Sequence, residues 1–217
     1  MPFKLKLRIF KREFLGTSKN ARHCVIENPE DIYMIYTEST NTLEAYCDTL
    51  LIIRNPSLGY TLTYFLDKFK WSTDSMYYRG NSFFEEDSKL HENNNPAILQ
   101  RRGKAYLGSR MQFFREIWLG ESENLEFRLR RQGSKDELTL EDFIQDGDRQ
   151  TKYLISDIPI KVSCKGNNST IQIQPGKRIL FTEKGYFDPK YIYWSGKMAQ
   201  ERVGDLLPYE FRPSANK

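Results

Sequence analysis

The sequence predicts an α+β protein made mainly of antiparallel β-sheet, with one principal amphipathic helix at about residues 97–119 and one or two short helices. Aromatic residues are frequent (14 Phe, 13 Tyr and 3 Trp), and aromatic side chains favour strands. Residues 60–69 alternate in the two-residue period of a strand. The helix is predicted from an apolar stripe at helical spacing: Leu107, Met111, Phe114 and Trp118.

The remaining elements follow from local patterns in chain order. Residues 3–9 alternate Phe, Leu and Ile with Lys and Arg, which predicts an opening strand. Further strands are expected at 31–37, 43–46, 50–54, 60–69, 75–79, 125–131, 158–164, 170–174, 178–182 and 191–194. Gly166, Asn167 and Asn168 predict a hairpin turn. Residues 134–144 and 198–207 predict two short helices.

The chain is long enough to bury a core without disulfides or metals. Charge and polarity rise at about residues 130–150. This indicates a β-rich region with the principal helix at 1–130 and a β-hairpin region at 131–217, which are either two domains or parts of one.

The formal net charge of +4 is small for 217 residues, so we expect no nucleic-acid partner. No run of 18 apolar residues is present, so no transmembrane helix is expected. The basic first residues lack an apolar central run and a small-residue cleavage site, which argues against a signal peptide.

Residues able to carry metal or catalytic chemistry are few. The histidines are His23 and His91, and the dispersed cysteines Cys24, Cys47 and Cys164 leave the disulfide state open. No phosphate-binding glycine motif or nucleophile motif is present. We therefore expect no metal, no cofactor, no catalytic residues and no enzyme.

The candidate binding residues are the basic side chains of one segment and a C-terminal tryptophan: Arg101, Arg102, Lys104, Arg110, Arg115 and Trp194. The basic residues could hold an anion or an acidic chain, or could pair with the carboxylates at 85–87. Exposed aromatics could stack on sugars, or could pack within strands: Tyr77, Tyr78, Tyr191 and Trp194.

Five stretches together carry a family resemblance: FLGTSKNARHCVIENPE (14–30), RNPSLGYTLTYFLDKF (54–69), YRGNSFFEE (78–86), RRGKAYLGSRMQFFREIW (101–118) and YWSGKMAQERVGDLLP (193–208). They resemble the C-terminal part of Bacteroidota cell-envelope proteins described as containing a carboxypeptidase-like regulatory domain. The resemblance implies export and a transthyretin-like β-sandwich upstream, whereas from this sequence we expect neither the sandwich nor a signal peptide. It carries Gln112 where the family pattern holds a His, and no catalytic residues carry over.

The resemblance implies a non-catalytic domain of the periplasm or outer membrane that binds an envelope glycan, peptide or protein partner. One alternative is a hydrolase of envelope polymers that uses acidic residues. Another is a truncated family member without independent activity. Because no signal peptide is seen, a complete chain would be cytoplasmic. The oligomeric state stays open.

Overall fold

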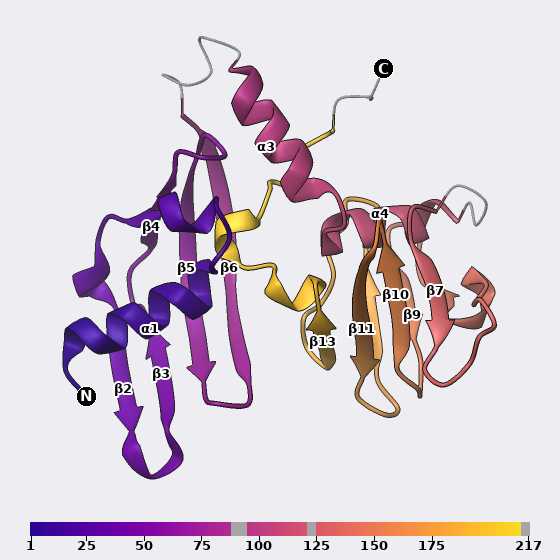
Figure 1. The fold of residues 1–217 in the computed structure, drawn as a ribbon, viewed down its shortest axis with the longest axis horizontal. Coiled ribbons are helices and arrows are strands. Elements are labelled where there is room, and N and C mark those ends of the chain that lie inside the picture. Colours follow the sequence, from indigo (N-terminus) through magenta and orange to yellow (C-terminus); the bar gives the residue numbers. More distant parts are fainter. Residues whose placement is uncertain (88–94, 121–124, 214–217) are drawn as a thin grey trace. The chain divides into compact units, whose positions relative to one another are not determined.

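The computed structural model describes residues 1–87, 95–120 and 125–213 (Figure 1). These residues form two compact units. Unit 1 combines Met1–Lys104 with Arg202–Pro208, and unit 2 combines Ala105–Glu201 with the described residues from Tyr209 onward. The chain thus leaves unit 1 near residue 104 and returns to it for one short segment, whereas the division suggested by composition lies at about residue 130.

Unit 1 contains one antiparallel sheet of six strands within the described residues. The strands are β1 (Val25–Ile26), β2 (Tyr33–Thr37), β3 (Thr42–Tyr46), β4 (Leu51–Asn55), β5 (Tyr60–Trp71) and β6 (Met76–Glu86). The long strand β5 organises the sheet, because β4 and β3 pair with successive parts of one edge and β6 pairs along the other. The prediction of a β-rich α+β fold with antiparallel sheets is confirmed.

The opening strand expected at residues 3–9 is wrong: Phe3–Leu15 form helix α1, which lies across one face of the sheet (Figure 1). Phe10 and Phe14 are fully buried, and both rings lie against Phe69 of β5. Alternation over a few residues can coincide with a helical stripe, and here Leu7 continues that stripe toward the N-terminus. Burial of Phe10 and Phe14 against the sheet stabilises the helix rather than a strand.

The segment 202–208 belongs to the core of unit 1, far from its neighbours in sequence. The Asp205 carboxylate accepts hydrogen bonds from Ser18 Oγ (2.8 Å) and Asn20 Nδ2 (2.9 Å). Asn55 is 1% exposed, and its amide donates to the Gly204 carbonyl at 3.0 Å. A Cβ on Gly204 would lie 2.6 Å from the Cα of Ala21, so only glycine permits this close approach.

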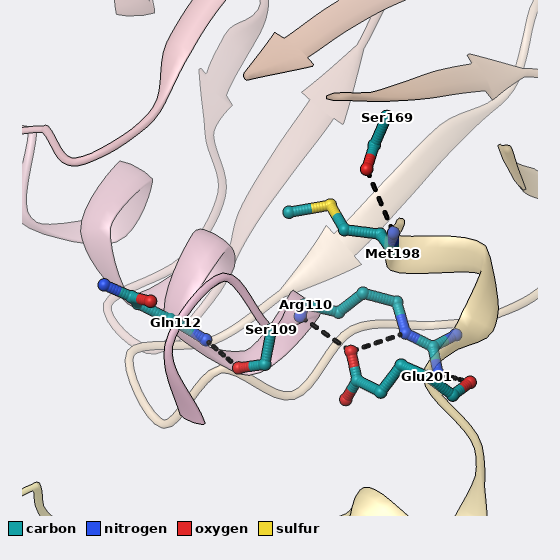
Figure 2. Close-up of polar contacts among 6 residues, drawn as sticks. All are labelled: Ser109, Arg110, Gln112, Ser169, Met198 and Glu201. Carbon is teal, nitrogen blue, oxygen red and sulfur yellow. Dashed lines mark hydrogen bonds and ion pairs between the residues drawn. The ribbon is translucent and has the colours of Figure 1, made fainter. Parts of the chain in front are cut away.

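The single principal helix at 97–119 is not confirmed, because two helices occupy its place: α3 (Pro96–Tyr106) and α4 (Arg110–Leu119). Gly108 adopts φ 75°, which stops α3. Ser109 then caps α4, since its Oγ accepts from the Gln112 backbone N–H at 3.0 Å (Figure 2). The break changes the buried face, and Leu107 is left 44% exposed.

Unit 2 contains two antiparallel sheets within the described residues, with strand orders β13-β11-β10-β7 and β12-β9-β8. Their bounds are β7 (Arg128–Arg131), β8 (Ile144–Asp146), β9 (Lys152–Ile155), β10 (Ile160–Cys164), β11 (Asn167–Ile173), β12 (Arg178–Phe181) and β13 (Ile192–Gly196). The predicted hairpin is present between β10 and β11, but Asn167 and Asn168, which were expected in its turn, lie in β11. Its turn residues Lys165 and Gly166 both have positive φ, as expected for a two-residue turn of this kind.

The core of unit 2 joins α4 to both sheets. Phe113, Phe114 and Ile117 of α4 are fully buried. They pack in one cluster with strand residues such as Leu154, Ile160, Val162, Ile171, Ile179 and Phe181.

The short helices expected at 134–144 and 198–207 are instead single 3₁₀ turns at Leu140–Asp142, Met198–Gln200 and Val203–Asp205. Gly204 lies inside the last of these segments, and glycine disfavours a continuous helix.

Candidate binding site

The basic residues of α3 named from the sequence are used mostly within unit 1. Arg102 is 9% exposed, and its guanidinium donates to the carbonyl oxygens of 58 and 59 and to Glu86 Oε1 at 2.8 Å. Arg101 Nε donates to the carbonyl of Ser57 at 2.6 Å. Both side chains therefore hold the 57–59 loop against α3, while Lys104 is exposed.

Arg110 anchors the start of α4 within unit 2. Its backbone N–H and its Nε both donate to Glu201 Oε2, at 2.9 and 3.2 Å, as Figure 2 shows. The guanidinium also lies 5.9 Å from the centre of the Trp194 ring. Trp194 itself packs edge-on against Phe114. The structure therefore brings Arg110 and Trp194 together, in a contact that builds the unit.

Arg115 is buried in unit 2 and fastens three backbone segments. Its guanidinium nitrogens donate to the carbonyl oxygens of Lys184, Tyr209 and Phe211 at 2.9–3.0 Å. Such a guanidinium has its donors aimed at the protein itself. The basic residues predicted to bind a ligand therefore make contacts within unit 1 or within unit 2 instead. Among these basic residues, only Lys104 is broadly exposed.

A cavity of about 740 Å³ lies in unit 2 where the ends of its two sheets meet. It is lined by Arg131, Leu138, Asp142, Phe143, Ile155, Ser156, Asp157, Ile158, Gly176, Lys177, Arg178 and Tyr191. The cavity is open to solvent, since lining residues such as Asp157, Lys177 and Arg178 are exposed, and its volume lies in the range of small-ligand sites. Of the aromatics considered for sugar stacking, Tyr191 lines this cavity, whereas Tyr78 packs on Phe14 and Trp194 on α4.

The backbone of Tyr191 is left-handed, with φ 71°. This conformation costs a bulky residue about 1–2 kcal/mol, and it persists only where the surroundings hold it. The Tyr191 carbonyl accepts from the Gln174 N–H at 2.9 Å, which fixes the residue next to the 174–178 turn. Lys190 and Lys177 place their ammonium groups 4.8 and 5.1 Å from the ring centre. The hydrogen bond from Lys190 lowers the pKa of Tyr191.

The lining of the cavity also carries a paired carboxylate, Asp142. Asp142 Oδ2 accepts from the backbone N–H and the hydroxyl of Thr139, at 2.8 and 3.1 Å. These bonds, helped by the nearby Arg131 charge, lower the pKa of Asp142. The Arg131–Asp142 separation is 3.5 Å. Asp142 is therefore ionised at neutral pH and closes the 3₁₀ turn rather than acting as a proton donor.

Catalytic arrangements are sparse among the described residues. His23 Nδ1 lies 2.8 Å from the Lys19 carbonyl oxygen and 3.2 Å from Ser57 Oγ. The carbonyl can only accept, so Nδ1 carries the proton and does not serve as a base for Ser57. Burial raises the pKa of Glu116, but Glu116 does not line the cavity. Glycoside hydrolysis needs a proton-donating carboxyl beside a second one in the same site.

Within residues 1–87, 95–120 and 125–213, no group of three or more His, Cys, Asp or Glu side chains could hold a metal ion. His91, named from the sequence, lies outside these ranges. No helix within them is long and apolar enough to cross a membrane. Cys24, Cys47 and Cys164 are free thiols.

A second exposed feature is the face of the unit 1 sheet that alternates away from Phe69 and α1. It displays Phe65 (45% exposed) and Phe83 (64% exposed) on paired strands. Tyr33 and Tyr46 stack there with ring centres 5.1 Å apart. Apolar faces of this kind occur at protein interfaces. The cavity in unit 2 differs because defined polar groups converge on it.

Of the residues that line the cavity, Tyr191 was a candidate from the sequence, whereas Arg131, Lys177 and Arg178 were not. The available signal was weak: two basic residues follow the Pro175-Gly176 turn directly. Comparison of the chain with protein-family models, with curated proteins and with solved structures finds no match in any of the three.

Proposed function

We propose that the chain is a non-catalytic binding domain and that unit 2 holds its ligand in the cavity beside Tyr191. The observation that carries the proposal is the left-handed Tyr191 backbone at the wall of a cavity of about 740 Å³. Backbone strain in a bulky residue concentrates at ligand sites, where it positions a side chain before the ligand arrives. The strained residue presents an aromatic ring, a group well suited to ligand contact.

The chemistry of the lining supports binding rather than turnover. The Asp142 carboxylate is held by Thr139 and has a lowered pKa, so it does not supply a proton at neutral pH. The other lining groups are a second carboxylate, the exposed Asp157, together with cations, hydroxyls and apolar side chains. The resemblance to envelope proteins favours an envelope glycan, peptide or protein as the source of the ligand. The hydrolase reading would require an acid–base pair in this cavity.

The test uses Tyr191→Gly, because glycine adopts φ 71° without strain and the substitution removes the side chain with its ring. Isotope-labelled protein is titrated with short glycans and short peptides while amide shifts are followed. The expected result is saturable shifts at cavity residues in the parent protein, loss of these in Tyr191→Gly, and ligands recovered intact.

The matched control is Tyr193→Ala, two residues away in β13, where the ring is 60% exposed and does not line the cavity. This variant should bind as the parent does. Equal binding by Tyr191→Gly and the parent would place the site elsewhere. Release of cleaved products that depends on Asp142 or Asp157 would show that the domain is a hydrolase.

A further inference from the structure

We infer that the cavity in unit 2 takes a monoanionic, hydroxylated ligand of the sugar-acid class, with its carboxylate bound by Lys177 and Arg178. This inference rests on the proposed function, because it names the ligand class of the same site. It arises from a juxtaposition: two cations of the lining lie over tyrosine rings, Lys177 over Tyr191 and Arg178 over Tyr153, and the same lining carries the carboxylate of Asp157.

The first step is the charge of the lining. Three basic side chains line the cavity (Arg131, Lys177 and Arg178) against two carboxylates, Asp142 and Asp157, so the lining is positive by one charge. Arg131 and Asp142 pair with each other at 3.5 Å. In the parts of the chain that the structure describes, Lys177 and Arg178 form no ion pair with a carboxylate. The unbalanced positive charge therefore belongs to these two residues.

The second step is how the cations are held. The Arg178 guanidinium carbon lies 3.9 Å from the centre of the Tyr153 ring. A guanidinium close over a ring face is held by cation–π attraction and can keep its N–H groups available for hydrogen bonds at its edge. A carboxylate matches this edge with two parallel hydrogen bonds. The contact with Tyr153 orients Arg178 without neutralising it.

The third step separates charged from neutral sugars. Stacking of a neutral sugar needs a free aromatic face, but the tyrosine that lines the cavity, Tyr191, has Lys177 and Lys190 within 5.1 Å of its ring centre. The Tyr191 ring therefore holds cations where a neutral sugar would stack. The recognition element is therefore positive charge, and the ligand group that it fits is an anion.

The fourth step is the part of the ligand beyond its anionic group. Asp157 is exposed on the lining and can accept hydrogen bonds from ligand hydroxyls. Two carboxylates on the same lining disfavour a dianion such as phosphate. The net positive lining disfavours a zwitterionic amino acid relative to a net monoanion. A hydroxylated monocarboxylate satisfies both the cations and Asp157, and glucuronate is the probe of this class.

The experiment titrates the full chain separately with glucuronate, glucose, inorganic phosphate and alanine, using calorimetry and amide shifts. We expect saturable binding of glucuronate, with shifts at residues 177, 178 and 191, that weakens as ionic strength rises. Arg178→Gln and Lys177→Gln should each weaken binding about tenfold or more, the scale of a charge-assisted hydrogen bond. Lys161→Gln, an exposed lysine of β10 off the cavity, should leave it unchanged.

The outcomes separate this inference from the proposed function. Glucose binding as tightly as glucuronate, with Arg178→Gln unaffected, would overturn the anionic class while the cavity remains a binding site. Preferential binding of phosphate or alanine at the same residues would do the same. If Lys161→Gln weakened glucuronate binding as much as Lys177→Gln does, the binding would reflect the general positive charge of the surface. This result would overturn the inference. Absence of binding by all four probes would overturn this inference, and the proposed function would fall with it only if the short glycans and short peptides of its own test also fail to bind.

Discussion

Replacing Phe114 of α4 by alanine tests how unit 2 is held together. The Phe114 ring is fully buried, stacks on Phe187 at 4.6 Å and lies 5.2 Å from Phe181. Burial of such a side chain contributes about 1.5–3 kcal/mol. The stacked aromatic pair adds about 0.5–1.5 kcal/mol. With the cavity that alanine leaves, we expect the free energy of unfolding of unit 2 to fall by about 3–5 kcal/mol.

The assay is urea unfolding followed by tryptophan fluorescence, because Trp194 lies 6.1 Å from Phe114 and reports the same core. The control is Leu119→Ala at the end of the same helix, where the side chain is 70% exposed. The control should cost less than about 0.5 kcal/mol. A loss below about 1 kcal/mol for Phe114→Ala would refute the reasoning, because the α4 stripe would then not be packed as the structure has it.

Three further outcomes follow from local geometry and burial. Gly103→Ala should stabilise the protein by about 0.5–1 kcal/mol, because an added Cβ within α3 meets nothing within 4 Å. Gly108→Ala should destabilise it by about 1 kcal/mol, because Gly108 has φ 75°. Thermal melts in which Gly108→Ala is the more stable variant would contradict the division into two helices. Burial raises the pKa of Glu116 above its ordinary 4.5, so the folded protein holds the Glu116 proton more tightly than the unfolded chain does. The resulting stabilisation is present at low pH and is lost as the pH rises through the raised pKa. A Glu116→Gln variant whose unfolding free energy keeps the parent's pH dependence would count against this. Burial raises the pKa of Cys24 to about 12, so its alkylation at pH 8 should be slow until the chain is unfolded, and rapid labelling of native protein at this residue by mass spectrometry would contradict the placement.

Local patterns predicted many of the strands and turns, because their causes are local. The β10–β11 hairpin followed from Gly166, whose positive φ a two-residue turn requires. The run at 60–69 became β5 because its alternation matches a sheet with one covered face. These features depend on residues that are neighbours in the sequence, so they can be predicted from the sequence alone.

The misread elements depend on tertiary packing. Residues 3–9 satisfy both a strand period and a helical stripe, and contact with Phe69 selects the helix. The stripe through 107–118 looked continuous, although Gly108 and Ser109 are a stop and a cap for two helices. The positive φ of Gly108 ends α3, and an added Cβ at this glycine would meet nothing within 4 Å.

The candidate site was largely hidden from sequence because its lining comes from separated segments of residues 131–191. Arg102, Arg110 and Arg115 look like a basic cluster, yet each directs its guanidinium at internal oxygens. Lys177 and Arg178 carry no motif, and only the fold places them at a cavity beside aromatic rings. The strain at Tyr191 is a backbone property that residue identity does not reveal.

The most direct test of the central claim is a crystal structure of the protein soaked with glucuronate. The account predicts an intact sugar acid in the cavity of unit 2, with its carboxylate hydrogen-bonded to Arg178 and Lys177 and its ring beside Tyr191. Tyr191 should keep its left-handed backbone with the ligand bound. Sugar bound only at other surfaces, with the cavity residues unchanged and no ligand density at Arg178, would contradict the account.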